Sequence, residues 1–435
     1  MNRAVGLLAA LAILCLSPGV SRAATRPAFE DLVANLKSPN AKTRQDAAEA
    51  LGKSRRREAV TPLAAVIRDP EAKVRLEVVK ALRELRDLAA VPALVAAIGD
   101  EDARIREEAI GTLVEVYAER DRMGPIGRFL NIFSDEYDRS SVPPYTNVDP
   151  SVYRALAMAL KDEQKTIREA AALSIGILDG GSVVGDLIIA LQDPDAGVRG
   201  AAATAIGKIG NAEDGKKLIP LLADESTNVR NRVLQALGVL RVREAGPALR
   251  EMFEANRRKE MGLRVLACMS RTGDPAQADL FRELIQDPDP ERKRYAVEGL
   301  GRVSDASSLE AFKKDYQRER NDELKVAYSF ALTLLGDRAF LDTLVLSLPS
   351  RTVGNRCRGY ILEMGRAILP ELYPYLNDPD AEIRAELCDI LAAFGDPQAI
   401  SNLTPLLSDP SPKVSDRANR AIERLKRSGA TAGAR

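Results

Sequence analysis

Leucines recur at a fixed interval along this chain of 435 residues. Eight of them lie 31 residues apart or twice that distance, and three more resume the interval one residue out of phase. The eight are Leu32, Leu63, Leu94, Leu156, Leu187, Leu218, Leu249 and Leu280, and the three are Leu341, Leu372 and Leu403. Such a period indicates one small structural unit repeated about thirteen times. Counted by leucine position, Leu32 marks the first unit and Leu403 the thirteenth.

Two polar positions accompany the leucine in many of the units. An arginine follows twelve residues after the leucine, and an acidic residue stands six residues before that arginine. The pairs are Asp69 and Arg75, Asp100 and Arg106, Asp162 and Arg168, Asp193 and Arg199, Asp224 and Arg230, and Asp378 and Arg384. Proline follows the acid directly in several units, as in Asp69-Pro70, and this dipeptide ends one helix and begins the next.

The apolar residues on both sides of the acid have helical spacing. Before it, Val91, Leu94, Val95 and Ile98 recur at three and four residues, which places them on one helix face. After the arginine, residues 74–82 repeat this spacing. The sequence therefore predicts an all-α protein, an α-solenoid of about thirteen antiparallel helix pairs over residues 24–427.

Glycines recur near the expected end of the second helix. They are Gly52, Gly176, Gly207, Gly238 and Gly301. Glycine is the usual residue in the left-handed conformation that ends a helix, so we expect these residues to close the second helices.

The pattern of Asp-Pro, four or five residues, Val-Arg and an Ala-rich helix ending in Leu-Gly resembles the HEAT repeat family. The resemblance is in particular to its short class of about 31 residues, which is also found in phycobilin lyases, and it covers about residues 28–427. The resemblance implies a ladder of hydrogen bonds between aspartate and arginine along the stack. It assigns this role to pairs such as Asp69 with Arg75 and Asp193 with Arg199. It implies a scaffold and no particular chemistry.

The chain contains no histidine, which excludes several kinds of active site. A Ser-His-Asp triad, a Cys-His dyad and the usual His-containing zinc or iron sites all require it. Acidic residues are plentiful but none stands out as a buried pair, and Asp135, Glu136 and Asp138 lack the spacing of a cation loop. We therefore expect no catalytic residue, no metal and no cofactor.

Residues 1–23 have the pattern of a secretory signal peptide. Arg3 precedes an apolar run from Ala4 to Leu16, and Ser21 and Ala23 are small residues at the positions that signal peptidase reads. The alternative is a retained anchor, but the run is shorter than the roughly 20 residues that span a bilayer. We expect cleavage after Ala23, no membrane span in the mature chain, and a periplasmic or extracellular location.

The mature chain has a balanced charge. Removing Arg3 and Arg22 from 63 basic and 63 acidic residues leaves a net charge of −2. The arginines alternate with acids, whereas a nucleic-acid interface concentrates basic residues on one surface. We expect no nucleic acid partner, and the arginine row is interpreted as structure and not as a phosphate-binding stripe.

Three cysteines remain in the mature chain, namely Cys268, Cys357 and Cys388. Export would permit oxidation of Cys357 and Cys388, which lie one unit apart. Equivalent positions on neighbouring helices are usually too far apart for a disulfide. Three buried thiols are the favoured state, and a bond between Cys357 and Cys388 is the alternative.

The fourth unit departs most from the pattern. Pro125 and Tyr137 stand where the leucine and arginine should be, and Pro143-Pro144 cannot lie inside a helix. The spacing from Leu94 to Leu156 is nevertheless two full periods. We expect an irregular repeat over about residues 124–150, in which a loop replaces the second helix and leaves a break in one wall of the solenoid.

This segment is rich in aromatic residues. Five of the nineteen in the chain are Phe129, Phe133, Tyr137, Tyr145 and Tyr153. Long irregular segments often carry function, and tyrosines suit partner contacts. We predict a partner-binding site here, and the alternative is that the rings fill the space of the missing helix.

Two further irregularities lie toward the carboxyl terminus. The one-residue phase slip between Leu280 and Leu341 predicts a local change in superhelical twist. Residues 428–435 have no apolar face and are expected to form a disordered tail.

These features favour an exported, non-enzymatic scaffold. It would bind a protein or peptide partner through its concave helical face and the aromatic and proline-rich loop of the fourth unit. The alternative is a lyase-like or small-molecule-binding protein that holds a ligand in the concave groove.

Overall fold

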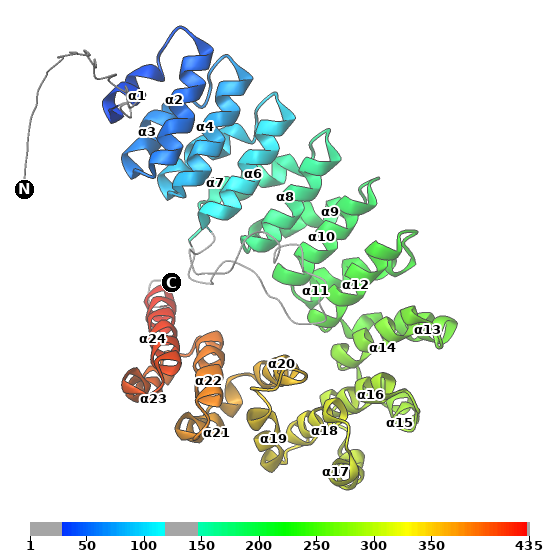
Figure 1. The fold of residues 1–435 in the computed structure, drawn as a ribbon. Coiled ribbons are helices and arrows are strands. Elements are labelled where there is room, and N and C mark those ends of the chain that lie inside the picture. Colours follow the sequence, from blue (N-terminus) through cyan, green and yellow to red (C-terminus); the bar gives the residue numbers. More distant parts are fainter. Residues whose placement is uncertain (1–27, 118–146, 433–435) are drawn as a thin grey trace, which may run out of the picture.

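The computed structural model describes residues 28–117 and 147–432, with side chains described as far as residue 427. Every regular element in this part of the chain is a helix, and successive helices pack as antiparallel pairs along one curved stack (Figure 1). The predicted all-α solenoid is confirmed. Short 3₁₀ turns precede many of the first helices, and η5 (Lys216–Ala223), η11 (Tyr373–Asn377) and η12 (Thr404–Ser408) complete three of them.

The first helices of the pairs are short and the second helices are longer. The first helices are α1 (Phe29–Asn35), α3 (Val60–Ala65), α5 (Val91–Ala97), α7 (Pro150–Ala159), α9 (Val184–Ala190), α11 (Ala212–Gly215), α13 (Gly246–Asn256), α15 (Ala278–Leu284), α17 (Leu309–Arg318), α19 (Leu341–Leu346), α21 (Leu369–Leu372) and α23 (Ala399–Leu403). The second helices are α2 (Ala41–Ser54), α4 (Ala72–Leu85), α6 (Ala103–Tyr117), α8 (Lys165–Ile177), α10 (Ala196–Ile209), α12 (Thr227–Val239), α14 (Glu260–Thr272), α16 (Pro290–Arg302), α18 (Asp322–Leu334), α20 (Gly354–Met364), α22 (Ala381–Phe394) and α24 (Pro412–Ala432).

The periodic leucines lie on the first helices and form the centre of the core. All are buried except Leu32, which lies on α1 at the start of the described stack and is only half-buried. Burying a leucine side chain contributes about 1.5 to 3 kcal/mol relative to leaving it exposed. The 31-residue interval is therefore the interval at which the stack requires one large apolar side chain.

The glycines near the ends of the second helices do not adopt the predicted left-handed conformation. That conformation belongs to Arg55, Asp179, Arg241 and Ser304, each three residues after one of the glycines. The glycines lie inside the helices, and their role is close packing. A Cβ added to Gly52 would lie 2.7 Å from the Cα of Ala81, and one added to Gly207 would lie 2.8 Å from the Cβ of Ala236. Glycine is thus required where one second helix meets the next.

This close packing determines the direction of curvature. The second helices contact one another extensively along the stack, whereas the first helices make few contacts with each other. The second helices therefore lie on the concave side and the first helices on the convex side. Figure 1 shows the arrangement most clearly in the carboxyl-terminal half, where α14, α16 and α18 lie inside α13, α15 and α17.

The expected break in the wall at the fourth unit is absent. Helix α6 of the third unit packs directly on α8 of the fifth, and α5 contacts α7. The two ends of the intervening segment lie together, because the backbone N–H of Asp149 donates a 3.2 Å hydrogen bond to the hydroxyl of Tyr117. The prediction of a break was wrong because a segment of one full period keeps the leucine register even when it is inserted between two stacked units. The predicted loop itself lies outside the described residues.

The phase slip coincides with a division of the hydrophobic core. Helix α18 contributes Ala327, Tyr328, Ala331 and Leu332 to the core that begins at Leu36, and it contributes Val326 and Phe330 to a second core that continues to Leu425. Beyond α18, the contacts of α20 with α18 and α22 are sparse compared with those between other second helices. The stack therefore changes direction at this point.

The last helix extends further than expected. Helix α24 continues to Ala432, whereas a disordered tail is predicted from Ser428. A helix that is already formed extends at little cost through residues such as alanine, because each added residue gains one backbone hydrogen bond. An apolar face is not needed for these last residues.

Candidate partner-binding surface

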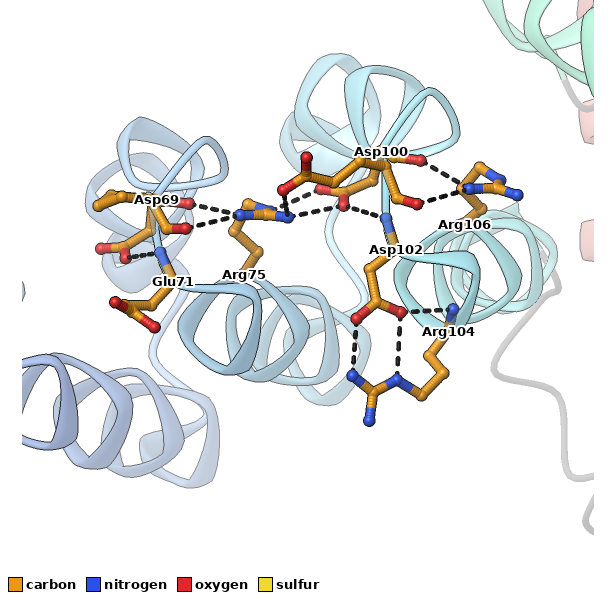
Figure 2. A network of polar contacts seen from close by, with 9 residues as sticks. Asp69, Glu71, Arg75, Asp100, Asp102, Arg104 and Arg106 are labelled. Atoms are coloured by element: carbon orange, nitrogen blue, oxygen red, sulfur yellow. Dashed lines mark hydrogen bonds and ion pairs between the residues drawn. The ribbon is translucent and has the colours of Figure 1, made fainter.

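A ladder of arginine and aspartate side chains runs along the turns between first and second helices. Arg75 donates hydrogen bonds from Nε to Oδ2 of Asp100 at 2.7 Å and from Nη2 to Oδ1 at 2.9 Å (Figure 2). Its Nη1 donates to the backbone carbonyls of Asp69 and Pro70. One arginine thus fixes the turn of its own unit and holds the carboxylate of the next.

The partner of each arginine lies one unit further along than the assignment made from the resemblance. The carboxylate that pairs with Arg75 is that of Asp100, and Arg75 contacts only the backbone of Asp69. The side-chain pairs are Arg44 and Asp69, Arg75 and Asp100, Arg106 and Asp162, Arg168 and Asp193, Arg199 and Asp224, and Arg384 and Asp409. The pair of Arg106 and Asp162 spans the inserted segment, so the ladder passes it without interruption.

Five of the ladder carboxylates have a pKa below the ordinary value, namely Asp69, Asp162, Asp193, Asp224 and Asp409. Burial raises the pKa of Asp69, but the hydrogen bonds from Arg44 and from the backbone N–H of Glu71 outweigh it and leave the pKa below its ordinary value. For Asp409, the hydrogen bond from Arg384 is the largest influence and lowers the pKa. These arginines and aspartates serve the stack, and their guanidinium and carboxylate groups are directed at each other.

The exposed face of the second helices forms an inner wall from α2 to α12. One buried row on these helices carries only small residues, namely Ala81, Thr112, Ser174, Ala205 and Ala236. The row just before it is at least partly exposed and consists of Glu49, Lys80, Gly111, Leu173, Thr204 and Gln235. The buried row is uniform because neighbouring helices must approach closely, whereas the exposed row differs in charge and size at each unit.

A hollow of about 400 Å³ lies in this inner wall between α4 and α6. Leu76 and Lys80 line it from α4, and Glu107, Gly111 and Thr112 line it from α6. Gly111 has no side chain, and nothing lies within 4 Å of the place where its Cβ would be. The buried hydroxyl of Thr112 has no hydrogen-bond partner among the described residues. The hollow therefore combines open space with charged and polar groups that can bind a ligand group.

The same wall is covered in the ninth to eleventh units. The ring of Tyr360 on α20 stacks on Phe330 of α18, with centroids 4.2 Å apart. Its hydroxyl donates a 2.6 Å hydrogen bond to Glu298 of α16. Glu363, one turn further along α20, pairs with Arg302 of α16 and with Arg241 at the end of α12. Helix α20 thus lies over the inner faces of α16 and α18.

This covering network is buried and charged. Glu298 accepts hydrogen bonds from Arg294 at 2.8 Å and from Arg302 at 3.1 Å. Burial raises the pKa of Glu298, but the two arginines and Tyr360 lower it more strongly, to about 2. The sequence does show the four-residue spacing of Arg294, Glu298 and Arg302 on one helix face. The partners on α20 were not predictable, because they lie two units away.

The structure places only one of the predicted aromatic partner-binding residues. Phe129, Phe133, Tyr137 and Tyr145 lie outside the described residues. The hydroxyl of Tyr153 donates a 2.8 Å hydrogen bond to the backbone carbonyl of Leu178, and burial raises its pKa to about 12. Tyr153 therefore joins α7 to the end of α8, which is a structural role within the stack.

Among the described residues, the cysteines and acidic residues form neither a disulfide nor a metal-binding cluster. Cys268, Cys357 and Cys388 are free and buried, and burial raises the pKa of each thiol to about 12. Within residues 28–117 and 147–432, no three Cys, Asp or Glu residues are grouped so that they could hold a metal ion. In the same part of the chain, no helix is long and apolar enough to cross a membrane.

The chain is similar to several solved structures. An engineered protein is 19% identical over 92% of this chain and 98% of its own, with a TM-score of 0.38. The YibA protein of E. coli is 19% identical over 63% of this chain and 93% of its own, with a TM-score of 0.41. The complex of CpcE and CpcF of phycocyanin lyase from Nostoc is 20% identical over 68% of this chain and 99% of its own, with a TM-score of 0.30. No curated protein matches the chain.

The model of the HEAT repeats matches five segments, of which the three middle ones overlap. They are residues 29–114, 153–237, 184–262, 215–301 and 369–433. Together they cover more than half of the chain, and they leave out the inserted segment between the third and fifth units. The helix pairs, the arginine and aspartate ladder and these matches agree, and the chain belongs to the HEAT-repeat family.

Proposed function

We propose that this protein is an exported, non-enzymatic scaffold that binds a protein or peptide partner on the inner wall from α2 to α12. The observation that supports this is the exposed row from Glu49 to Gln235, which changes in charge and size at each unit beside a buried row of small residues. If this face served only packing between helices, its residues would not need to differ in charge and size from unit to unit. Repeat proteins use variable exposed positions on a constant framework to distinguish partners.

The chemistry of the wall indicates the kind of partner. In the first three units it carries charges of both signs, such as Lys42, Asp46, Lys80 and Glu107. In the fifth and sixth units the row itself is uncharged, with Leu173 and Thr204 in the places of Glu49 and Lys80. An extended polypeptide with a charged end and an uncharged end would match this order. Electrostatic complementarity of this kind contributes specificity and speed of association.

The inserted segment is proposed as a second contact. The described residues on either side of it are joined, because the backbone N–H of Asp149 donates a hydrogen bond to the hydroxyl of Tyr117 at the end of α6. Its four aromatic residues, Phe129, Phe133, Tyr137 and Tyr145, remain the predicted partner-binding residues on the grounds of composition.

The inner-wall proposal is tested by exchanging charges on the two faces of the solenoid. The variant Lys80→Glu with Glu107→Lys alters the inner wall, and Lys217→Glu with Glu58→Lys makes the same exchange at exposed positions on first-helix turns. Affinity capture with each variant should lose the partner only with the first. Retention of the same partner by the inner-wall variant, with both variants folded, would contradict the proposal.

Export is tested separately from binding. Expression of the full chain followed by fractionation and mass spectrometry should give an extracytoplasmic protein that begins at Ala24. A chain that remains in the cytoplasm with residues 1–23 attached would contradict this part of the proposal.

The alternative function, a ligand held in the concave groove by a lyase-like protein, has less support. In the ninth to eleventh units, the inner face is covered by Tyr360 and Glu363 of α20. A coloured or ultraviolet-absorbing compound that copurifies with the protein would favour this alternative over the scaffold.

A further inference from the structure

The ladder stops at Arg230, the last of the regular arginines before the eighth unit. Its Nη1 donates to the backbone carbonyls of Asp224 at 2.5 Å and of Glu225 at 3.1 Å, as the equivalent group does in the other units. Its Nη2 donates to the hydroxyl of Thr227. Six equivalent arginines direct Nε and Nη2 at both oxygens of an aspartate in the next unit. Arg230 forms no ion pair within the described chain.

The cause is the residue at the position where the carboxylate should be. Asp224 lies six residues after Leu218, and the residue six after Leu249 is Ala255. There is also no Asp-Pro turn here, since α13 continues to Asn256 before the second helix begins at Glu260. The Nη1 group of Arg230 therefore keeps the ladder contacts with its own unit, whereas one N–H of Nη2 donates to Thr227 and the next unit offers no carboxylate at this position.

A hollow of about 860 Å³ opens at this place between the seventh and eighth units. Arg230 and Asn231 line it from α12, Met252 and Ala255 line it from α13, and Lys259 and Arg264 line it from the start of the next helix. The side-chain oxygen of Asn231 is buried and has no hydrogen-bond partner among the described residues. A buried polar atom of this kind destabilises the fold unless a partner reaches it.

Arg230 and Lys259 are the cations of the lining that can pair with a ligand, because the other charged groups are already paired or lie too far away. Arg199 pairs with Asp224 at 2.8 Å, and Arg264 pairs with Glu260 at 2.7 Å. Lys259 is exposed and forms no ion pair with a described residue. Glu251 is the remaining carboxylate of the lining, and it lies beyond ion-pair distance of these cations. It opposes an anionic ligand, so its removal should favour binding.

We propose that this hollow binds a carboxylate, with the guanidinium of Arg230 in the role that it has in the rest of the ladder. The two donors that other units direct at an aspartate would receive the two oxygens of the ligand. Such paired hydrogen bonds between arginine and carboxylate are stronger than neutral ones and have a fixed geometry. The proposal is independent of binding on the inner wall, because the hollow lies at the turns between the helices.

The carboxylate can belong to an acidic residue of a polypeptide or to a free dicarboxylic acid. The internal pattern favours the first, because the group that occupies this position elsewhere is an aspartate of the polypeptide, which proline follows in half of the ladder units, as in Asp193-Pro194 and Asp409-Pro410. A peptide also supplies backbone N–H groups for the unpaired oxygen of Asn231. An acidic side chain and a free dicarboxylic acid both present a carboxylate to Arg230, and the experiment below distinguishes them.

Ligand-observed NMR on the full chain with acetyl-Asp-Pro-amide, acetyl-Asn-Pro-amide and succinate tests the site. We expect binding of the Asp probe and at least about tenfold weaker binding of the uncharged Asn probe, as for loss of a charge-assisted pair. Binding of succinate alone would assign the site to free acids. Absence of binding by both the Asp probe and succinate would overturn the proposal.

Variants locate the binding. Arg230→Met should abolish it, and Lys217→Met, an exposed cation elsewhere, should leave it unchanged. Arg230 also holds the turn of its own unit, so its replacement could disturb the fold. A second variant therefore leaves Arg230 unchanged. Ala255→Asp restores an internal carboxylate and should reduce binding of the probe while the protein stays folded. Glu251→Gln should strengthen it. Unchanged binding in both Arg230→Met and Ala255→Asp would contradict the assignment.

Discussion

Glu363 and Arg302 lie 61 residues apart in the sequence, and their side chains form two hydrogen bonds, Nε to Oε1 at 2.8 Å and Nη2 to Oε2 at 3.0 Å. Glu363 accepts a third hydrogen bond from Arg241, which lies 122 residues before it. Neighbouring units of a solenoid ordinarily contact only each other. Here one carboxylate joins the seventh, ninth and eleventh units, and it holds α20 against the concave side of the stack.

Loss of this carboxylate should loosen the bend. Glu363→Gln removes one of the two carboxylates that pair with the buried Arg302 and leaves only that of Glu298, and breaking a buried pair costs about 3 kcal/mol. Urea denaturation should report the loss, and small-angle scattering should show a larger radius of gyration than the native chain. Glu382→Gln, which removes an exposed pairing with Lys413, is the control and should change neither quantity. An unchanged radius would show that α20 is held by its apolar contacts alone.

Two glycine substitutions should have opposite effects. Gly207→Ala would place a Cβ 2.8 Å from that of Ala236, and overpacking of this kind costs about 1 to 3 kcal/mol. Gly111 is also inside a helix, but nothing lies within 4 Å of its missing Cβ. Gly111→Ala should therefore stabilise the protein by about 0.5 to 1 kcal/mol. Thermal unfolding should show a lower midpoint for Gly207→Ala and a higher midpoint for Gly111→Ala than for the native protein. Stabilisation by Gly207→Ala would contradict the packing role.

The inserted segment should be removable without loss of the fold. Since Tyr117 and Asp149 are hydrogen-bonded, a short glycine and serine linker in place of residues 118–146 can join α6 to α7. We expect an unchanged helix content and little change in the unfolding midpoint. Unfolding of the shortened chain would show that the segment is part of the core. If the fold persists, the same variant tests the segment as a partner contact.

Acid should weaken the network around Glu298. Its folded pKa of about 2 lies below the ordinary value of 4.5, so the charged network contributes its full stability above pH 4.5. That contribution is lost as the pH falls through about 2. Denaturation at pH 7 and pH 3 should show that Glu298→Gln is less stable at pH 7 and loses less stability on acidification. An equal loss in both proteins would contradict the charged state of Glu298.

Much of the fold was predictable because each unit repeats the same local physics. The leucines predict the buried centre of each pair, and the acid and arginine predict a ladder. The sequence does not show which carboxylate an arginine reaches, because Asp69 and Asp100 differ only in the unit they belong to. The sequence also does not show that the third and fifth units stack directly on each other. An inserted segment of one full period leaves the spacing of the leucines unchanged.

The surface was less predictable than the core. The aromatic residues at 129–145 are conspicuous by composition alone, whereas the varied row from Glu49 to Gln235 is recognised only once the buried row beside it is known. The gap at Arg230 was visible as the absent acid at Ala255. Its meaning depends on the orientation of Arg230, which the turn of its own unit determines.

The central claim is that a partner binds the inner wall, and site-specific photocrosslinking tests it most directly. A photoreactive residue replaces Glu107 on the exposed side of α6 in one variant and Lys217 on η5 in the other. We expect the same polypeptide to be crosslinked repeatedly from position 107 and not from position 217. Crosslinking from position 217 alone would contradict the account.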